Sequence, residues 1–248
     1  MPRLIPFRLA AACALALALS LSISAGAAAK GVSASLRVVG KGGKVLTEQT
    51  LSTGTTKIKT SKSANCFGAG TAGSGRSVTV KGATALGLLS QAATSTASLR
   101  PLLVTDAFDF GLGICGVGGN VVKGKSSWYL KVNHKGAQVS GDAVKLHAGD
   151  EVLWDLAPSY PYPNELALEA PESATAGAPF QVRVFSYDEK GKRKPVAGAS
   201  VTGASGPTGS DGKATVTLSA PSHLSASHGK EIPAAAVAIC IAGACPAG

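Results

Sequence analysis

The chain has few aromatic and few acidic residues. Among 248 residues there are two Trp, four Tyr and six Phe, and 14 Asp or Glu stand against 24 Lys or Arg, a formal net charge of +10. A composition led by Gly, Ala, Ser, Thr and Val, with so little aromatic volume, is unlike that of a large enzyme core. It favours small β domains with thin cores and many turns.

Long apolar runs are also absent after residue 30, so no later segment is expected to span a bilayer. The one strongly apolar stretch, residues 9–23, follows Arg3 and Arg8 and precedes the small residues 25–29. A basic start, an apolar run and a small-residue site are typical of an export signal. We expect residues 1–29 to be a signal peptide, whose cleavage removes Cys13. An uncleaved membrane anchor is the alternative. The mature protein is then soluble and secreted, or held at the cell surface.

Sequence motifs of catalytic and metal sites are missing. There is no H-x-H, H-E-x-x-H or G-x-S-x-G pattern. Exposed loop positions are therefore favoured over ligand roles for the four histidines, which are His134, His147, His223 and His228. Asp106 and Asp109 are too close in sequence to indicate an acid–base pair. We expect no catalytic residue and no metal.

Residues 111–116 literally fit the G-x-G-x-x-G dinucleotide fingerprint. That fingerprint requires a helix to begin at the glycines and an acidic residue further on, and neither follows here. We interpret the segment as a loop that positions Cys115, and we expect no cofactor.

Four cysteines remain after residue 29: Cys66, Cys115, Cys240 and Cys245. An even number in an exported chain indicates two disulfides. Of the three possible pairings we choose Cys66–Cys115 and Cys240–Cys245, one for each expected domain. The first bond closes a loop of about 50 residues and would stabilise the fold by about 4 kcal/mol on the chain-entropy estimate.

The positive charge is unevenly distributed. Residues 30–166 hold 15 Lys or Arg against 8 Asp or Glu, whereas residues 167–248 hold 7 against 6. For an exported protein, the anionic partners that fit a basic domain are cell-wall polymers or a membrane surface. Nucleic acid is not expected, because the basic residues are not interleaved with a stacking pattern of aromatics. A basic surface that only aids solubility is the alternative.

The chain divides at the proline-rich residues 158–164, which we expect to be a linker. Before it, strand-like runs at residues 32–39 and 44–51 precede a helix predicted over residues 84–93, with Thr84 as its N-cap. Further strands are expected at residues 77–80, 102–104 and 107–110. Residues 30–157 therefore predict an α+β domain with one helix packed on a mixed sheet.

Residues 165–248 predict an all-β domain. Short alternating runs are separated by turn signals. The expected strands cover residues 165–169, 180–186, 196–202, 214–219 and 234–241. This spacing favours a small β-sandwich.

The segment WYLKVNHKGAQVSGDAVKLHAGDEVLW, residues 128–154, contains both tryptophans of the chain. Trp128 and Trp154 alternate with other apolar residues, so we favour core packing for them. The neighbouring tyrosines are expected to be exposed and could stack on a sugar or another flat ligand. The candidate ligand-binding residues are Tyr129, Asn133, Tyr160 and Tyr162.

The motifs Trp128–Asn133 and Gly149-Asp150-x-Val152-x-Trp154, with the helix TALGLLSQAA, make the first domain similar to a bacterial family of unknown function. That family is related to the C-terminal domain of transcobalamin and intrinsic factor. The resemblance spans residues 32–156 and implies a β-grasp-like fold. The chain lacks the helical domain that supplies most of the cobalamin site in transcobalamin.

The pattern AGAPFQVRVFSYDEKGKRKPVAGASVTG…TGSDGKATVTLSA makes the second domain resemble bacterial Ig-like or carboxypeptidase-regulatory-like modules. The resemblance covers about 75 residues and implies an Ig-like β-sandwich that serves as a spacer or adhesion module. In such modules the motif residues shape turns and core.

Together these observations predict a secreted, non-catalytic binding or cell-surface interaction protein. Its basic first domain would contact an unidentified extracellular partner, such as an anionic cell-wall polymer. The alternatives are capture of a small ligand, a corrinoid or a carbohydrate, and an extracellular hydrolase. A hydrolase would need a pocket that joins His134 or His147 to a carboxylate.

Overall fold

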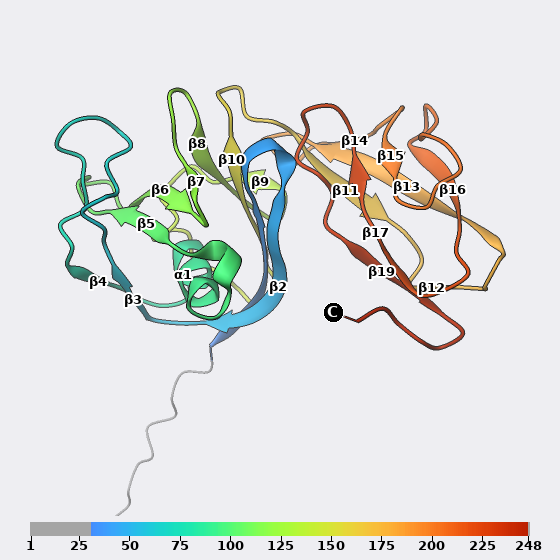
Figure 1. The fold of residues 1–248 in the computed structure, drawn as a ribbon, viewed down its shortest axis with the longest axis horizontal. Helices are drawn as coiled ribbons and strands as arrows, with labels where there is room; N and C mark the ends of the chain where they lie inside the picture. Colours follow the sequence, from blue (N-terminus) through green and yellow to red (C-terminus); the bar gives the residue numbers. More distant parts are fainter. Residues whose placement is uncertain (1–30, 248) are drawn as a thin grey trace, which may run out of the picture. The chain divides into compact units, whose positions relative to one another are not determined.

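A five-stranded mixed sheet lies at the centre of the first half of the chain (Figure 1). The computed structural model describes residues 31–247, so the expected signal peptide lies outside the described residues. The strand order is β2-β1-β10-β8-β9, in which β1 and β10 run parallel. The strands are β1 (Val32–Val39), β2 (Val45–Thr53), β8 (Ser127–Val132), β9 (Lys135–Gly136) and β10 (Glu151–Ala157).

The helix α1 (Ala85–Ser95) covers one side of this sheet, which we call the helix side. The Thr84 hydroxyl accepts a hydrogen bond from the backbone N–H of Gly87 at 3.0 Å, which confirms the predicted N-cap and helix. Leucines of α1 are fully buried against the sheet residues Leu36, Val38 and Trp154. Burial of this apolar face is what stabilises so short a helix.

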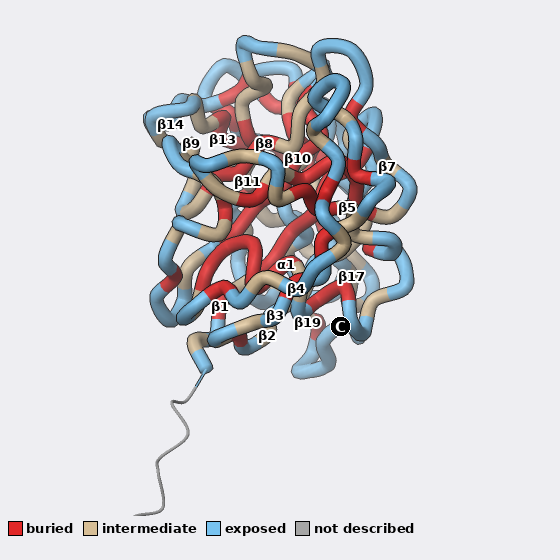
Figure 2. Tube along the Cα trace, turned by 90° about the vertical axis from the view of Figure 1, so that its left-hand side faces the viewer, coloured by how far each residue is buried: buried red, intermediate tan, exposed pale blue. Residues whose placement is uncertain are grey.

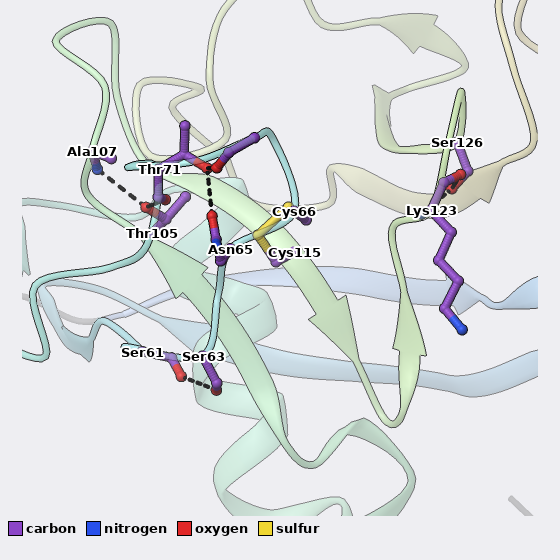
Figure 3. The surroundings of a disulfide bond; sticks show 11 residues. Ser61, Ser63, Asn65, Cys66, Thr71, Thr105, Ala107, Cys115, Lys123 and Ser126 are labelled. Atoms are coloured by element: carbon purple, nitrogen blue, oxygen red, sulfur yellow. Dashed lines mark hydrogen bonds between the residues drawn. A yellow bond between two sulfur atoms is a disulfide. The ribbon is translucent and has the colours of Figure 1, made fainter.

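Two smaller sheets extend the first half. The strands β3 (Thr56–Lys59) and β4 (Ser77–Val80) form one, and β5 (Leu102–Thr105), β6 (Gly113–Val117) and β7 (Asn120–Val121) form the other. A disulfide between Cys66 and Cys115 joins the long β3–β4 loop to β6 (Figure 3). Residues 107–110, predicted as a strand, form a loop instead.

The second half is built from three small sheets. Their orders are β11-β13-β14 with β16 also pairing with β13, β12-β19-β17, and β15-β18. The strands are β11 (Glu165–Glu169), β12 (Ser173–Ala174), β13 (Pro179–Tyr187), β14 (Arg193–Pro195), β15 (Ser200–Val201), β16 (Lys213–Thr217), β17 (Ser222–Leu224), β18 (Ala226–Ser227) and β19 (Val237–Ile241). A second disulfide, Cys240–Cys245, closes the turn after β19.

The predicted fold class is therefore wrong. The protein is mostly β, with 43% strand, 8% helix and several small sheets, and not an α+β β-grasp-like domain followed by an Ig-like sandwich. The physical reason lies in the interruptions of the strands. Residues 196–202, for example, were expected as one strand, but they form a turn around Gly198, at a φ of +78°, and then the two-residue β15. Interruptions of this kind divide the second half into three small sheets.

Both sides of the central strands of the five-stranded sheet are largely buried, as Figure 2 shows for β8 and β10. The side opposite α1, which we call the far side, includes the buried residues Arg37, Val39, Tyr129, Lys131, Leu153 and Asp155. Residues of the second half cover it, and Ile232 packs with Val39 and Leu153. The period-2 pattern predicted the apolar helix side, but the polar far side is also withdrawn from water.

Glu165, at the start of β11, pairs with both cations of the far side. Its Oε1 lies 2.5 Å from Nη2 of Arg37, and its Oε2 lies 3.5 Å from Nζ of Lys131. All three side chains are at most 9% exposed. Arg37 also donates to the carbonyl of Pro233, and Lys131 donates to the carbonyl of Tyr187 at 3.2 Å. Two cations of the first half are thus satisfied only by groups of the second half.

Replacing Glu165 by Gln would leave Arg37 and Lys131 buried without a counter-charge. Breaking a buried pair in this way is expected to lower the free energy of unfolding by about 3–5 kcal/mol. The control is Glu169→Gln, which removes an exposed ion pair with Arg193 and should change stability little. Urea unfolding followed by circular dichroism measures both. Equal effects of the two substitutions would contradict the role given to Glu165.

Candidate functional site

The three predicted ligand-binding tyrosines lie together but differ in exposure. The rings of Tyr129 and Tyr162 stack with centroids 4.0 Å apart, and Tyr160 meets Tyr162 edge-on at 5.6 Å. Tyr160 is 74% exposed, whereas Tyr129 is 6% exposed, so the expected exposure of Tyr129 is wrong. The second half covers the far side on which Tyr129 lies. Burial raises the pKa of the Tyr129 phenol, whose hydroxyl has no hydrogen-bond partner.

The side-chain amide of Asn133, the fourth predicted residue, forms hydrogen bonds within the chain. Its Nδ2 donates to Oδ1 of Asp150 at 2.8 Å, and its Oδ1 accepts from the N–H of Glu151 at 2.9 Å. These bonds fix the start of β10 against the β8–β9 turn. Asn133 is exposed, and these bonds hold its side chain in a fixed position. Trp154 is buried in the helix-side core and Trp128 packs against it, as the alternation predicted.

His134 was expected at an exposed loop position, but its side chain is 24% exposed and lies in the candidate site. With Asn133 it forms the two-residue turn between β8 and β9, and both have positive φ, +49° and +66°. Glycine is the usual residue at the second position of such a turn, so a histidine there carries a backbone cost. Its ring stacks on Tyr187 with centroids 3.9 Å apart. An Asn-His pair between alternating strands was the available signal for this turn.

The His134 ring lies between two carboxylates. Its Nδ1 is 3.1 Å from Oε2 of Glu165, and its Nε2 is 3.6 Å from Oε2 of Glu151. Burial alone would raise the pKa of Glu165, but His134, Arg37 and Lys131 together hold that pKa below its usual value. Glu165 is therefore ionised at neutral pH.

These residues line a groove of about 530 Å³, which we call the Glu165 groove. Its surface comes from β1, β2, β10, β11 and the segment before β19. The charged or titratable residues in it are Arg37, Glu48, His134, Glu151, Glu165, Glu169 and Tyr187. Pockets of this volume hold small organic ligands. The groove meets the geometric condition set above for a hydrolase, a pocket that joins His134 to a carboxylate.

The groove lacks other parts of a catalytic site. Within residues 31–247, no serine, threonine or cysteine hydrogen-bonds to His134, and no group of three or more His, Cys, Asp or Glu could hold a metal ion. The other histidines lie elsewhere: the His147 side chain is 85% exposed, and His228 pairs with Glu231 at 2.8 Å.

A second cavity, of about 640 Å³, opens at Asp155. Apolar walls from Leu156, Ile232 and prolines surround the carboxyl group, which is 5% exposed as a residue. Burial raises the pKa of Asp155 to about 7, although Arg37 acts in the opposite direction. The acid is thus partly protonated at neutral pH.

The exposed cations of the first half form the third feature. Twelve are exposed, and none of them has a carboxylate within 4.0 Å in the part of the chain that the structure describes. They are Lys41, Lys44, Lys57, Lys59, Lys62, Arg76, Lys81, Arg100, Lys123, Lys125, Lys135 and Lys145. Five of them lie in residues 54–82, a segment without any acidic residue that we call the cationic ribbon.

The cationic ribbon owes its outward charge to strand alternation. In β3, Ile58 is buried while Lys57 and Lys59 on either side of it are exposed. In register with these lysines, β4 presents the small residues Thr79 and Ser77. The lysine side chains are therefore not screened by bulky or acidic neighbours on this face.

The structure contains the cysteine pairs that the sequence favoured, Cys66–Cys115 and Cys240–Cys245. No helix in residues 31–247 is both long and apolar enough to cross a membrane.

No protein-family model matches the chain, and no curated protein matches it significantly. The site must therefore be interpreted from its own chemistry.

The raised pKa of Asp155 predicts a specific pH dependence of stability. The folded state holds the proton more tightly than the unfolded state, so stability is lost as the pH rises from about 4 to about 7. Asp155→Asn removes this loss. Between these pH values, the free energy of unfolding of the variant should rise by up to about 4 kcal/mol relative to that of the original protein, since one pKa unit is worth about 1.4 kcal/mol. Denaturant unfolding at several pH values tests this, and a difference that is constant with pH would contradict it.

Proposed function

We propose that the protein is an exported, non-catalytic binding protein that attaches to an anionic polymer at the cell exterior. The basic face of residues 31–157 is the attachment surface. The observation that supports this most is the set of twelve exposed cations without a carboxylate partner among the described residues.

The distribution of ion pairs explains why this face is available. Arg37 and Lys131 are buried and share the carboxylate of Glu165, so they are not presented on the outer surface. The exposed lysines and arginines are solvated and unpaired, and their summed potential attracts polyanions over about a Debye length. The cationic ribbon concentrates five of these charges on one segment.

Export is supported by two independent features. Residues 1–29 have the pattern of a signal peptide, and two disulfides are typical of an oxidising compartment. Residues 165–247 carry nearly balanced charge and cover the far side of the five-stranded sheet. In this proposal they stabilise the binding half and act as a spacer.

Capture of a small polar ligand in the Glu165 groove is the second candidate function. Its specific support is the groove itself, in which His134 contacts Glu165 and Glu151 within 3.6 Å. A hydrolase at the same place would require a nucleophile beside His134. The support for binding is the position of the His134 ring between two carboxylates, at 3.1 and 3.6 Å.

Charge reversal on the cationic ribbon tests the attachment. Lys57→Glu with Lys59→Glu should weaken binding to a soluble polyanion such as poly-L-glutamate by roughly tenfold or more at low salt, because four units of charge change at the contact. The matched control is Lys192→Glu with Lys194→Glu, two exposed lysines of the second half at the same spacing. Binding is measured by fluorescence anisotropy at several salt concentrations.

The original protein should lose affinity steeply as salt rises, and the control variant should follow it closely. Affinity that does not change with salt would refute the proposal. So would an equal loss in the two double variants, because the binding would then depend on total charge and not on this face.

A further inference from the structure

Three of the six phenylalanines gather at the surface beside the cationic ribbon. Phe108 stacks on Phe110 with centroids 4.9 Å apart and meets Phe67 edge-on at 5.4 Å. Phe110 is 75% exposed and Phe67 is 45% exposed. We call Phe67, Phe108 and Phe110 the phenylalanine cluster. Val139 is near the cluster, since its neighbour Ser140 hydrogen-bonds to Phe110. Phe67, Phe110 and Val139 are three of the six exposed large apolar side chains of the described residues.

Exposed aromatic rings that touch one another would normally move into a core, because burial of apolar surface is favourable. Here the loops that carry them are fixed. The disulfide at Cys66 holds the residue next to Phe67, and Asp106 accepts hydrogen bonds from the N–H and hydroxyl of Ser74 at 2.7 and 2.6 Å. The loops of Phe67 and Phe108 are thus tied to each other.

The other side of the cluster is fixed as well. The Ser140 hydroxyl donates to the carbonyl of Phe110 at 3.1 Å, and Oδ1 of Asp142 accepts from the N–H of Leu112 at 3.1 Å. Gly113 leaves room for the rings to rest on β6, since a Cβ there would lie 3.1 and 3.2 Å from Phe67 and Phe108. The rings are therefore presented on a rigid support.

The charges around the cluster indicate what it meets. Phe67 lies within the loop of the cationic ribbon, between Lys62 and Arg76, so an anionic partner is attracted to this place. Asp109, however, is exposed between Phe108 and Phe110. A bilayer would have to desolvate that carboxylate when Phe110 inserted, which is costly. A partner rich in hydroxyl groups would instead donate hydrogen bonds to it.

We propose that the phenylalanine cluster and the cationic ribbon form one binding site for an anionic polysaccharide. The apolar faces of its sugar rings stack on Phe110 and Phe67, and its acidic groups pair with the lysines and the arginine of the ribbon. This inference rests on the proposed function and specifies the polymer: the partner must offer both sugar rings and negative charge.

The test compares three soluble polymers. Polygalacturonate has sugar rings and charge, its fully methyl-esterified form has rings without charge, and poly-L-glutamate has charge without rings. Phe110→Ala should weaken binding of polygalacturonate roughly three- to tenfold and leave poly-L-glutamate binding unchanged. Phe110 is so exposed that its removal should not disturb folding. The control is Val45→Ala, which shortens another exposed apolar side chain, on β2, and should affect neither polymer.

The outcomes separate the two proposals. The esterified polymer should bind weakly, because it lacks the charge that the ribbon requires. If Phe110→Ala changes neither polyanion, or both equally, the polysaccharide site is refuted while charge-based attachment stands. Binding to vesicles of phosphatidylcholine and phosphatidylglycerol that is lost in Phe110→Ala would also refute it, in favour of a membrane. If the protein binds no polyanion at low salt, both proposals fail.

Discussion

The structure depends on one buried carboxylate. Glu165 compensates Arg37 and Lys131 on the far side of the five-stranded sheet, and without it the two halves of the described chain would meet across uncompensated positive charge. Buried ion pairs contribute little net stability compared with apolar contacts, but they reject arrangements in which a charge is left alone. Because the cations come from β1 and β8 and the carboxylate from β11, the pairing specifies how the second half covers the sheet.

The pairing of Glu165 with these cations also distinguishes a covered side of the first half from its exposed surfaces. The second half covers the far side, so Tyr129 serves packing there, whereas both tryptophans pack in the helix-side core. Five of the twelve exposed cations lie in the β3–β4 segment, and the phenylalanine cluster lies in the loop of that segment and the loop before β6, where the Cys66–Cys115 bond joins the two. The Glu165 groove is left at the boundary of the covered region, with His134 at its wall. The proposed attachment surface is therefore the part of the first half that the second half does not cover.

Features that depend on local sequence patterns could be predicted from the sequence. The covering of the five-stranded sheet by the second half of the chain could not. The helix with Thr84 at its start, the strand at residues 165–169 and the two cysteine pairs depend on spacing and capping. The burial of Tyr129 could not be predicted in this way. A polar strand face has the same sequence alternation whether it is exposed to water or covered by another part of the chain with complementary charges. The phenylalanine cluster was missed since Phe67 is some 40 residues from Phe108 in the chain. Its loop was predicted as a strand, and small, interrupted strands in place of extended sheets made the predicted fold class wrong.

Hydrogen exchange of backbone amides, with and without polygalacturonate, tests most directly which surface binds. Exchange reports the opening of individual segments, so it locates a bound polymer without any substitution. The account predicts slower exchange in the β3–β4 segment, residues 56–80, and in the loop at residues 106–113, with little change around the Glu165 groove. Slower exchange at residues 134–136 and 165–169, with none in the ribbon, would contradict it and assign binding to the groove.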